Sequence, residues 1–120
     1  MPSRYEPCGL GQMIAMRYGC IPVVRRTGGL ADTVIDCDSA LETGTGFVFQ
    51  DYSPSAFLEA LQRAVVAFPQ REPWRRLMVR AMSADFSWDA SARRYGVAYY
   101  RALARRAQAL RPASAPAADP

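Results

Sequence analysis

Apolar residues recur at helical spacing through the second half of the chain. The spacing predicts a helix that ends before Pro69, with Ser53 as its cap and Pro54 at its first position. The apolar face of this helix consists of Phe57, Leu58, Leu61, Ala64, Val65 and Phe68. Similar stripes predict two further helices, one over about residues 73–84 and one over about residues 88–110.

The last of these helices begins after Ser87 and carries large side chains along one stripe. That stripe consists of Trp88, Ala92, Tyr95, Tyr99, Ala102 and Leu103. We interpret its aromatic residues as core or interface residues and not as a platform for sugar binding. Proline and alanine dominate residues 111–120, which predicts a disordered tail after a domain over residues 1–110.

The first half of the chain alternates shorter elements with glycine-rich segments. Apolar residues on most of its surface predict a largely buried helix from about Cys8 to Tyr18, which Gly19 ends as a left-handed cap. Two apolar runs, residues 20–24 and residues 46–49, predict short buried parallel strands. A helical turn over residues 30–34 then leads into a polar surface loop over residues 36–46. The predicted fold class is therefore α/β, with more helix than strand.

Charge and composition narrow the possible functions. The net charge of +4 comes mainly from arginines beyond Arg71. Such a basic half suits either nucleic-acid binding or a solvated helix face, and we favour the second because no nucleic-acid motif accompanies the arginines. No apolar run approaches the roughly 20 residues that span a bilayer.

Cysteine and histidine usage bears on metals and compartment. The three cysteines, Cys8, Cys20 and Cys37, lack the spacing of metal ligands, and the chain has no histidine. The absence of histidine excludes nucleophile activation by histidine within this chain. We expect a cytoplasmic protein with no metal, no cofactor, no membrane and no nucleic-acid partner.

Candidate chemistry lies where the first predicted helix begins. Glu6 and Pro7 stand directly before Cys8, Gly9 and Leu10, whose N–H groups we expect to be free at the helix start. Free donors beside one carboxylate suit a polyhydroxylated or phosphorylated ligand. The alternative is that Glu6 only complements the helix dipole.

A second candidate loop follows the first predicted strand. Residues 25–29 contain Thr27 and the glycine pair Gly28 and Gly29. Ligands of open α/β sheets bind beyond the carboxyl ends of strands, and glycines permit a close approach of ligand to backbone. An ordinary glycine turn is the alternative.

Several segments together resemble the bacterial glycogen synthase and plant starch synthase family. They read PSRYEPCGL at residues 2–10, with Gln12 after it, and YGCIPVVRRTGGLADTV at residues 18–34. Weaker matches are GTGFVF at residues 44–49 and FSW at residues 86–88. Members of this family are retaining glycosyltransferases with two Rossmann-like domains, the GT-B type. The resemblance implies that this chain is the C-terminal part of the nucleotide-sugar-binding domain.

The resemblance also implies roles for individual residues. Glu6 would contact the transferred glucose near its 3-hydroxyl and would be the catalytic residue. The remaining substrate-binding residues would be Cys8, Gly9, Leu10, Gln12, Thr27, Gly28 and Gly29. The donor would be ADP-glucose and the acceptor the non-reducing end of an α-1,4-glucan, with retention of configuration.

Three departures from the family pattern qualify this reading. Ile14 stands where many retaining relatives have a second glutamate, although the starch synthase branch also often lacks it, and Gly11 replaces a hydroxyl or amide residue. The family's diphosphate-binding arginine and lysine would precede Met1. We therefore expect a fragment that is inactive alone and active only within a longer enzyme. The alternatives are a piece of another retaining GT-B transferase and a non-enzymatic helical interaction module.

Overall fold

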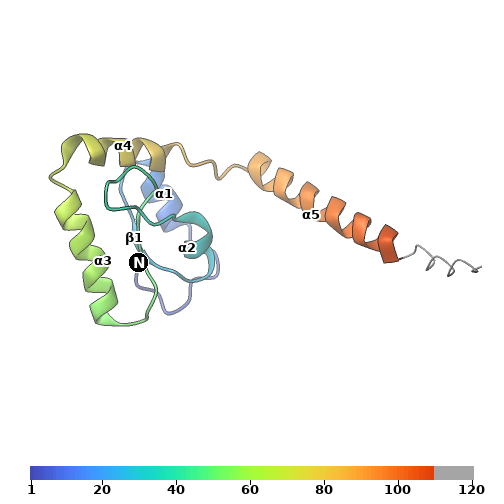
Figure 1. Cartoon of the computed structure of the whole chain (residues 1–120), viewed down its shortest axis with the longest axis horizontal. Coiled ribbons are helices and arrows are strands. Elements are labelled where there is room, and N and C mark those ends of the chain that lie inside the picture. Colours follow the sequence, from blue (N-terminus) through green and yellow to red (C-terminus); the bar gives the residue numbers. More distant parts are fainter. Residues whose placement is uncertain (110–120) are drawn as a thin grey trace, which may run out of the picture. The chain divides into compact units, whose positions relative to one another are not determined.

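The computed structural model describes residues 1–109, which form two units (Figure 1). The first unit is Met1–Ala84, and the second begins at Asp85. The predicted tail over residues 111–120 and the last residue of the predicted domain, Leu110, lie outside the described residues.

Two short parallel strands form the sheet of the first unit, as predicted. Strand β1 (Val23–Arg25) pairs with β2 (Phe47–Phe49), and Val24 lies opposite Val48. Strand β1 begins later than its apolar run because Pro22, which lacks an N–H, lies just before it, and β2 begins one residue after Gly46. On the other edge of β1, the amino group of Met1 donates to Val23 O at 2.6 Å and Arg25 N donates to Met1 O at 3.1 Å.

Helices cover both faces of this small sheet. Successive side chains of a strand point to opposite faces, so the neighbours Phe47 and Val48 of β2 lie in two different apolar clusters. The first cluster contains Met16, Val24, Leu30, Val34, Val48 and Ala81. The second contains Cys37, Leu41, Phe47, Ala64, Ala67 and Leu77. In Figure 1, β1 accordingly runs between α3 (Pro54–Ala67) and α2 (Gly28–Thr33).

The first helix differs from its prediction in start and burial. Helix α1 (Gly11–Arg17) begins three residues after Cys8, because Gly9 has a left-handed φ of 69°. Gln12 and Met16 are its buried residues, whereas Leu10 and Ile14 are 66% and 57% exposed. The predicted largely buried helix is therefore wrong, and one narrow face packs on α2 and on α4 (Arg71–Met82). Gly19 caps the helix as expected, with a φ of 77°.

The boundaries of α3 follow the prediction, but its buried face does not. Ser53 Oγ accepts a hydrogen bond from Ala56 N at 3.2 Å, and the helix starts at Pro54. Its buried residues are Ala60, Ala64 and Ala67. The larger Leu58, Leu61, Val65 and Phe68 are exposed. Small alanines let the helix backbone lie close to the strands, which the apolar count alone could not indicate.

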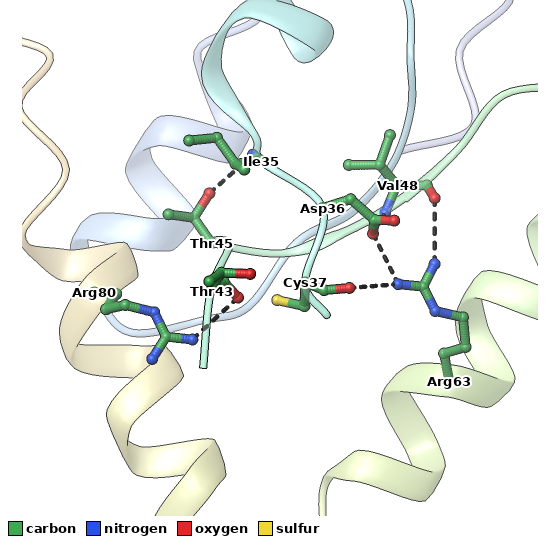
Figure 2. Close-up of polar contacts among 8 residues, drawn as sticks. All are labelled: Ile35, Asp36, Cys37, Thr43, Thr45, Val48, Arg63 and Arg80. Atoms are coloured by element: carbon green, nitrogen blue, oxygen red, sulfur yellow. Dashed lines mark hydrogen bonds and ion pairs between the residues drawn. The ribbon is translucent and has the colours of Figure 1, made fainter. Parts of the chain in front are cut away.

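Two arginines hold the segment between Asp36 and Gly46 in place through hydrogen bonds (Figure 2). From α3, Arg63 donates to Asp36 Oδ1 and to Cys37 O, both at 2.9 Å. From α4, Arg80 donates to Leu41 O at 2.7 Å and to Thr43 O at 3.2 Å. The segment was predicted as a surface loop, but Cys37 and Leu41 are buried. Burial raises the pKa of the Cys37 thiol to about 11.

The second unit contains one long helix, α5 (Trp88–Ala109). Ser87 Oγ accepts from Ala90 N at 3.2 Å, which confirms the predicted cap. No described residue of α5 is buried, and Trp88 and Tyr95 are among its exposed side chains. The core reading of its aromatic residues is therefore wrong within this unit, and the interface reading stays a prediction.

Candidate active site

Two loops meet at the carboxyl edge of the sheet. The first loop is residues 2–10, and the second loop is residues 26–29, which joins β1 to α2 and includes the first two residues of that helix. The N–H of Gly29 donates to Glu6 O at 2.9 Å and to Pro7 O at 3.2 Å. The structure thus brings together the two loops that the sequence singled out.

The glycine pair makes this approach possible. A Cβ on Gly29 would overlap the Cys8 carbonyl and lie 2.6 Å from Cys8 Cα, and one on Gly28 would lie 2.9 Å from Glu6 C. Ordinary contacts of a Cβ begin near 3.4 Å. Gly28 also has a left-handed φ of 45°, which favours glycine. The absent side chains make room for the first loop, whereas the sequence suggested room for a ligand or an ordinary turn.

The carboxylate of Glu6 is partly buried in the first loop. Ser3 Oγ donates to Glu6 Oε2 at 3.0 Å. Across residues 1–109, Glu6 Oε1 has no hydrogen-bond partner, so it is free to accept from a ligand. The first turn of α1 contains no acidic residue, and Gly11 begins that helix five positions after Glu6. Glu6 therefore lies outside the first turn of α1, and its role at a ligand, as against the dipole of α1, stays a prediction.

The backbone of Cys8, Gly9 and Leu10 precedes α1 and does not form its first turn. Leu10 is the N-cap residue, so the expected free helix amides at Cys8 and Gly9 are loop amides instead. Within the described chain, none of these three N–H groups donates a hydrogen bond. Their carbonyl side is occupied: Gln12 Nε2 donates to Gly9 O at 2.9 Å and to Cys8 O at 3.3 Å. Three donors therefore remain for a ligand, close in sequence to the Glu6 carboxylate.

The other two predicted binding residues have different positions. Gln12 is completely buried, and its Nε2 also donates to Thr33 Oγ1 at 3.0 Å. Thr27 is partly buried at the N-cap of α2, where its side chain makes no capping hydrogen bond. Direct ligand contacts of Gln12 and Thr27 stay predictions.

Arg25, at the carboxyl end of β1, bonds to the first loop and to the segment that follows β2. It donates from Nη1 to Arg4 O at 2.8 Å and from Nε to Gln50 O at 3.0 Å. Its guanidinium carbon lies 5.4 Å from the centre of the Tyr52 ring. A mainly apolar groove of about 350 Å³ adjoins this point, lined by Pro2, Phe49, Tyr52, Ser53, Pro54 and Phe57.

Comparison with known proteins identifies the relatives of this arrangement. No protein-family model matches the chain. A glycogen synthase of Geotalea uraniireducens is 58% identical over 106 residues, which are 88% of this chain and 22% of the relative. A glycogen synthase of Moorella thermoacetica is 54% identical over 112 residues, which are 92% of this chain and 23% of that relative.

This chain is homologous to the glycogen synthases. It spans just over a fifth of the length of the relatives that it matches. Among solved structures, the catalytic domain of starch synthase IV from Arabidopsis thaliana, bound to ADP and acarbose, matches with a TM-score of 0.71 and 47% identity. The match covers 86% of this chain and 22% of that chain. It confirms the predicted fold class, part of a GT-B synthase domain that is rich in helix.

Sequence reasoning missed two residues that shape the site of this glycogen synthase homologue. Thr33 donates to Gly29 O at 2.6 Å, and its position four residues after Gly29 in a helix is the signal that could have indicated this bond. Arg25 ends a buried strand, and a charged side chain there was a signal for a structural role at the sheet edge. Both residues fall inside the resemblance but carried no assigned role.

Among residues 1–109, no cluster of three or more histidine, cysteine, aspartate or glutamate side chains could hold a metal ion. Over the same residues, none of the helices combines the length and the apolar character needed to cross a membrane.

Proposed function

We propose that this chain is the part of a glycogen synthase that holds the glucosyl donor. The reaction is transfer of glucose from ADP-glucose to the non-reducing end of an α-1,4-glucan, with retention of configuration. The observation that carries the proposal is the junction of the two loops, found in a chain 54–58% identical to glycogen synthases over most of its length. The ADP in the related starch synthase structure supports an adenine nucleotide as the leaving group.

The site supplies donors and one acceptor where a sugar needs them. Free N–H groups of Cys8, Gly9 and Leu10 can donate to sugar hydroxyls or to the leaving diphosphate. The free Oε1 of Glu6 can accept from a glucose hydroxyl, while Ser3 fixes the other carboxylate oxygen. Catalysis in this proposal comes from positioning both substrates and from stabilising the charge on the departing diphosphate.

The rest of the cleft belongs to other parts of the whole enzyme in this proposal. The cations that neutralise the diphosphate and the surface that binds the acceptor glucan are assigned to segments outside this chain. We place the reaction in the cytosol, since Cys8, Cys20 and Cys37 are all free thiols. Another GT-B transferase is less well supported, because the relatives named above are glycogen synthases.

A chimaera tests the proposal. Residues 1–109 of this chain replace the matching segment of the Geotalea uraniireducens glycogen synthase, and glucose transfer to glycogen is measured with ADP-glucose and with UDP-glucose. We expect transfer from ADP-glucose within about tenfold of the parent enzyme, which corresponds to ~1.4 kcal/mol of barrier. A chimaera that melts cooperatively near the parent temperature but transfers no glucose would contradict the proposal.

A further inference from the structure

The buried side chain of Gln12 links the two loops through hydrogen bonds. Gln12 on α1 is fully buried, and its Nε2 donates to Cys8 O and Gly9 O of the first loop. The same nitrogen donates to Thr33 Oγ1 on α2 at 3.0 Å. One amide nitrogen therefore reaches both the backbone of the first loop and the helix that follows the second loop.

Thr33 carries the connection to the second loop itself. Its hydroxyl accepts from Gln12 and donates to Gly29 O at 2.6 Å. Gly29 then returns to the first loop through its own N–H, which donates to Glu6 O. These hydrogen bonds form a closed ring: Gln12 bonds to Thr33, Thr33 to Gly29, and Gly29 to the first loop. The first loop in turn accepts hydrogen bonds from Gln12.

We propose that Gln12 and Thr33 form a latch that positions Glu6 and the free loop amides for glucose transfer. The proposal rests on the proposed function, and it makes both residues positioning residues that act through the backbone. Complete burial of Gln12 explains why its contribution is indirect in this arrangement. Polar contacts suit this task because each has a defined direction, whereas apolar packing tolerates sliding.

The unpaired side-chain oxygen of Gln12 indicates that this position needs the amide nitrogen of glutamine. Within residues 1–109, Gln12 Oε1 is buried and has no hydrogen-bond partner. An unpaired buried carbonyl oxygen costs free energy, so the stability of the fold alone does not favour glutamine at this position. The same oxygen would lie 2.6 Å from a Cβ on Gly9, whose φ of 69° already favours glycine. The latch thus also fixes the residue type in the middle of the first loop.

Thr45 offers a matched control. Its Oγ1 accepts a hydrogen bond from Ile35 N at 3.0 Å in the segment that Arg80 fastens (Figure 2). Thr33→Val and Thr45→Val each remove the hydroxyl of a half-buried threonine and keep the side-chain shape. Only Thr33 belongs to the hydrogen bonds that link the two loops. Comparison of the two variants therefore separates an effect on positioning from a general loss of stability.

The first measurement is enzymatic and uses the chimaera described above. We expect Thr33→Val to lower kcat/KM for ADP-glucose by about tenfold or more, and Thr33→Ser to restore it to within about threefold. Thr45→Val should stay within about threefold of the unmodified chimaera at a comparable shift in melting temperature. Equal kcat/KM for Thr33→Val and Thr45→Val would overturn the latch while leaving the proposed function intact.

The second measurement needs no activity. Amide hydrogen exchange of the 120-residue chain reports on Gly29 N–H, which bonds to the first loop, and on Phe47 N–H, which bonds to Pro22 O in the sheet. We expect Thr33→Val to accelerate exchange at Gly29 by about tenfold or more with little change at Phe47. Unchanged protection at Gly29 would overturn the latch. Should the unmodified chimaera transfer no glucose, the proposed function fails and this exchange experiment still decides the latch.

Discussion

Adding one methyl group at Gly29 should push the two loops of the candidate site apart. In Gly29→Ala the new Cβ would overlap the Cys8 carbonyl and lie 2.6 Å from Cys8 Cα. The nearest atoms belong to backbone, which cannot rotate away as a flexible side chain can. The first loop must therefore retreat by about 1 Å, and the Gly29 N–H loses its bonds to Glu6 O and Pro7 O.

The expected loss of stability follows from these two effects. Forcing an extra methyl group into a packed region costs about 1–3 kcal/mol. Losing the hydrogen bonds of one buried N–H adds about 1 kcal/mol. For a unit the size of Met1–Ala84, a total of about 2–4 kcal/mol lowers the melting temperature by roughly 10–25 °C. Because misplacement by about 1 Å can cost about 10²-fold in rate, the chimaera should also lose most of its glucose transfer.

Gly11→Ala provides the matched control for this experiment. Gly11 begins α1, and a Cβ there would lie 3.7 Å from Met1 Cε, which is an ordinary contact. This change should raise the unfolding free energy by about 0.4–1 kcal/mol, because alanine restricts the unfolded chain. Scanning calorimetry of the 120-residue chain compares the two variants. Melting of Gly29→Ala within about 2 °C of Gly11→Ala would refute the packing argument.

Four other results are expected. Iodoacetamide at pH 8.5 should modify Cys8 and Cys20 but spare Cys37 until the chain unfolds, and rapid labelling of Cys37 in the folded chain would contradict its burial. Because burial raises the pKa of Cys37 from 9.0 to about 11, its contribution to folding should be complete below pH 9 and fall between pH 9 and about 11; a flat denaturation midpoint over that range would argue otherwise. Arg63→Met should lower the unfolding free energy by about 1–2 kcal/mol, measured by urea denaturation, since it removes the partly exposed pair with Asp36 and the bond to Cys37 O; no change would show that this contact adds nothing. The 120-residue chain alone should transfer no glucose from ADP-glucose to glycogen, and measurable transfer would disprove the assignment of essential groups to other segments.

Local signals predicted the elements well. Ser53 and Ser87 cap their helices through their own hydroxyls, and Gly19 ends α1 in the left-handed conformation. Each of these features depends on a few neighbouring residues, so the sequence alone contains the necessary information. The parallel pairing of β1 and β2 followed from two apolar runs separated by helix and loop.

Burial was harder to predict, because it depends on what lies opposite. Periodicity indicated that α3 is amphipathic, and it favoured large residues such as Leu58 and Val65 for the core. The structure places Ala60 and Ala64 against the sheet instead, because short side chains allow close packing. The start of α1 was predicted too early, because Gly9 has a left-handed φ of 69° and interrupts the helical backbone before Gly11.

The candidate site was predicted in part. The resemblance selected both loops, and the structure shows them in contact through Gly29. The bonds of Thr33 to Gln12 and of Arg25 to Arg4 O could not be read from the sequence, because each joins residues 21 positions apart in the chain. The direct ligand contacts assigned to Glu6 and Thr27 stay predictions.

Substitution of Glu6 tests the central claim most directly. In the chimaera, Glu6→Gln keeps the side-chain shape and leaves the neighbouring Ser3 in place. It removes the carboxylate that, in this proposal, accepts a hydrogen bond from the transferred glucose. Glu42→Gln, on the exposed segment before Gly44, is the control. We predict that both variants melt close to the unmodified chimaera, and that only Glu6→Gln loses one to several powers of ten in turnover, at ~1.4 kcal/mol per power. Near-normal kcat and KM for Glu6→Gln with ADP-glucose and glycogen would contradict the claim that Glu6 holds the transferred glucose.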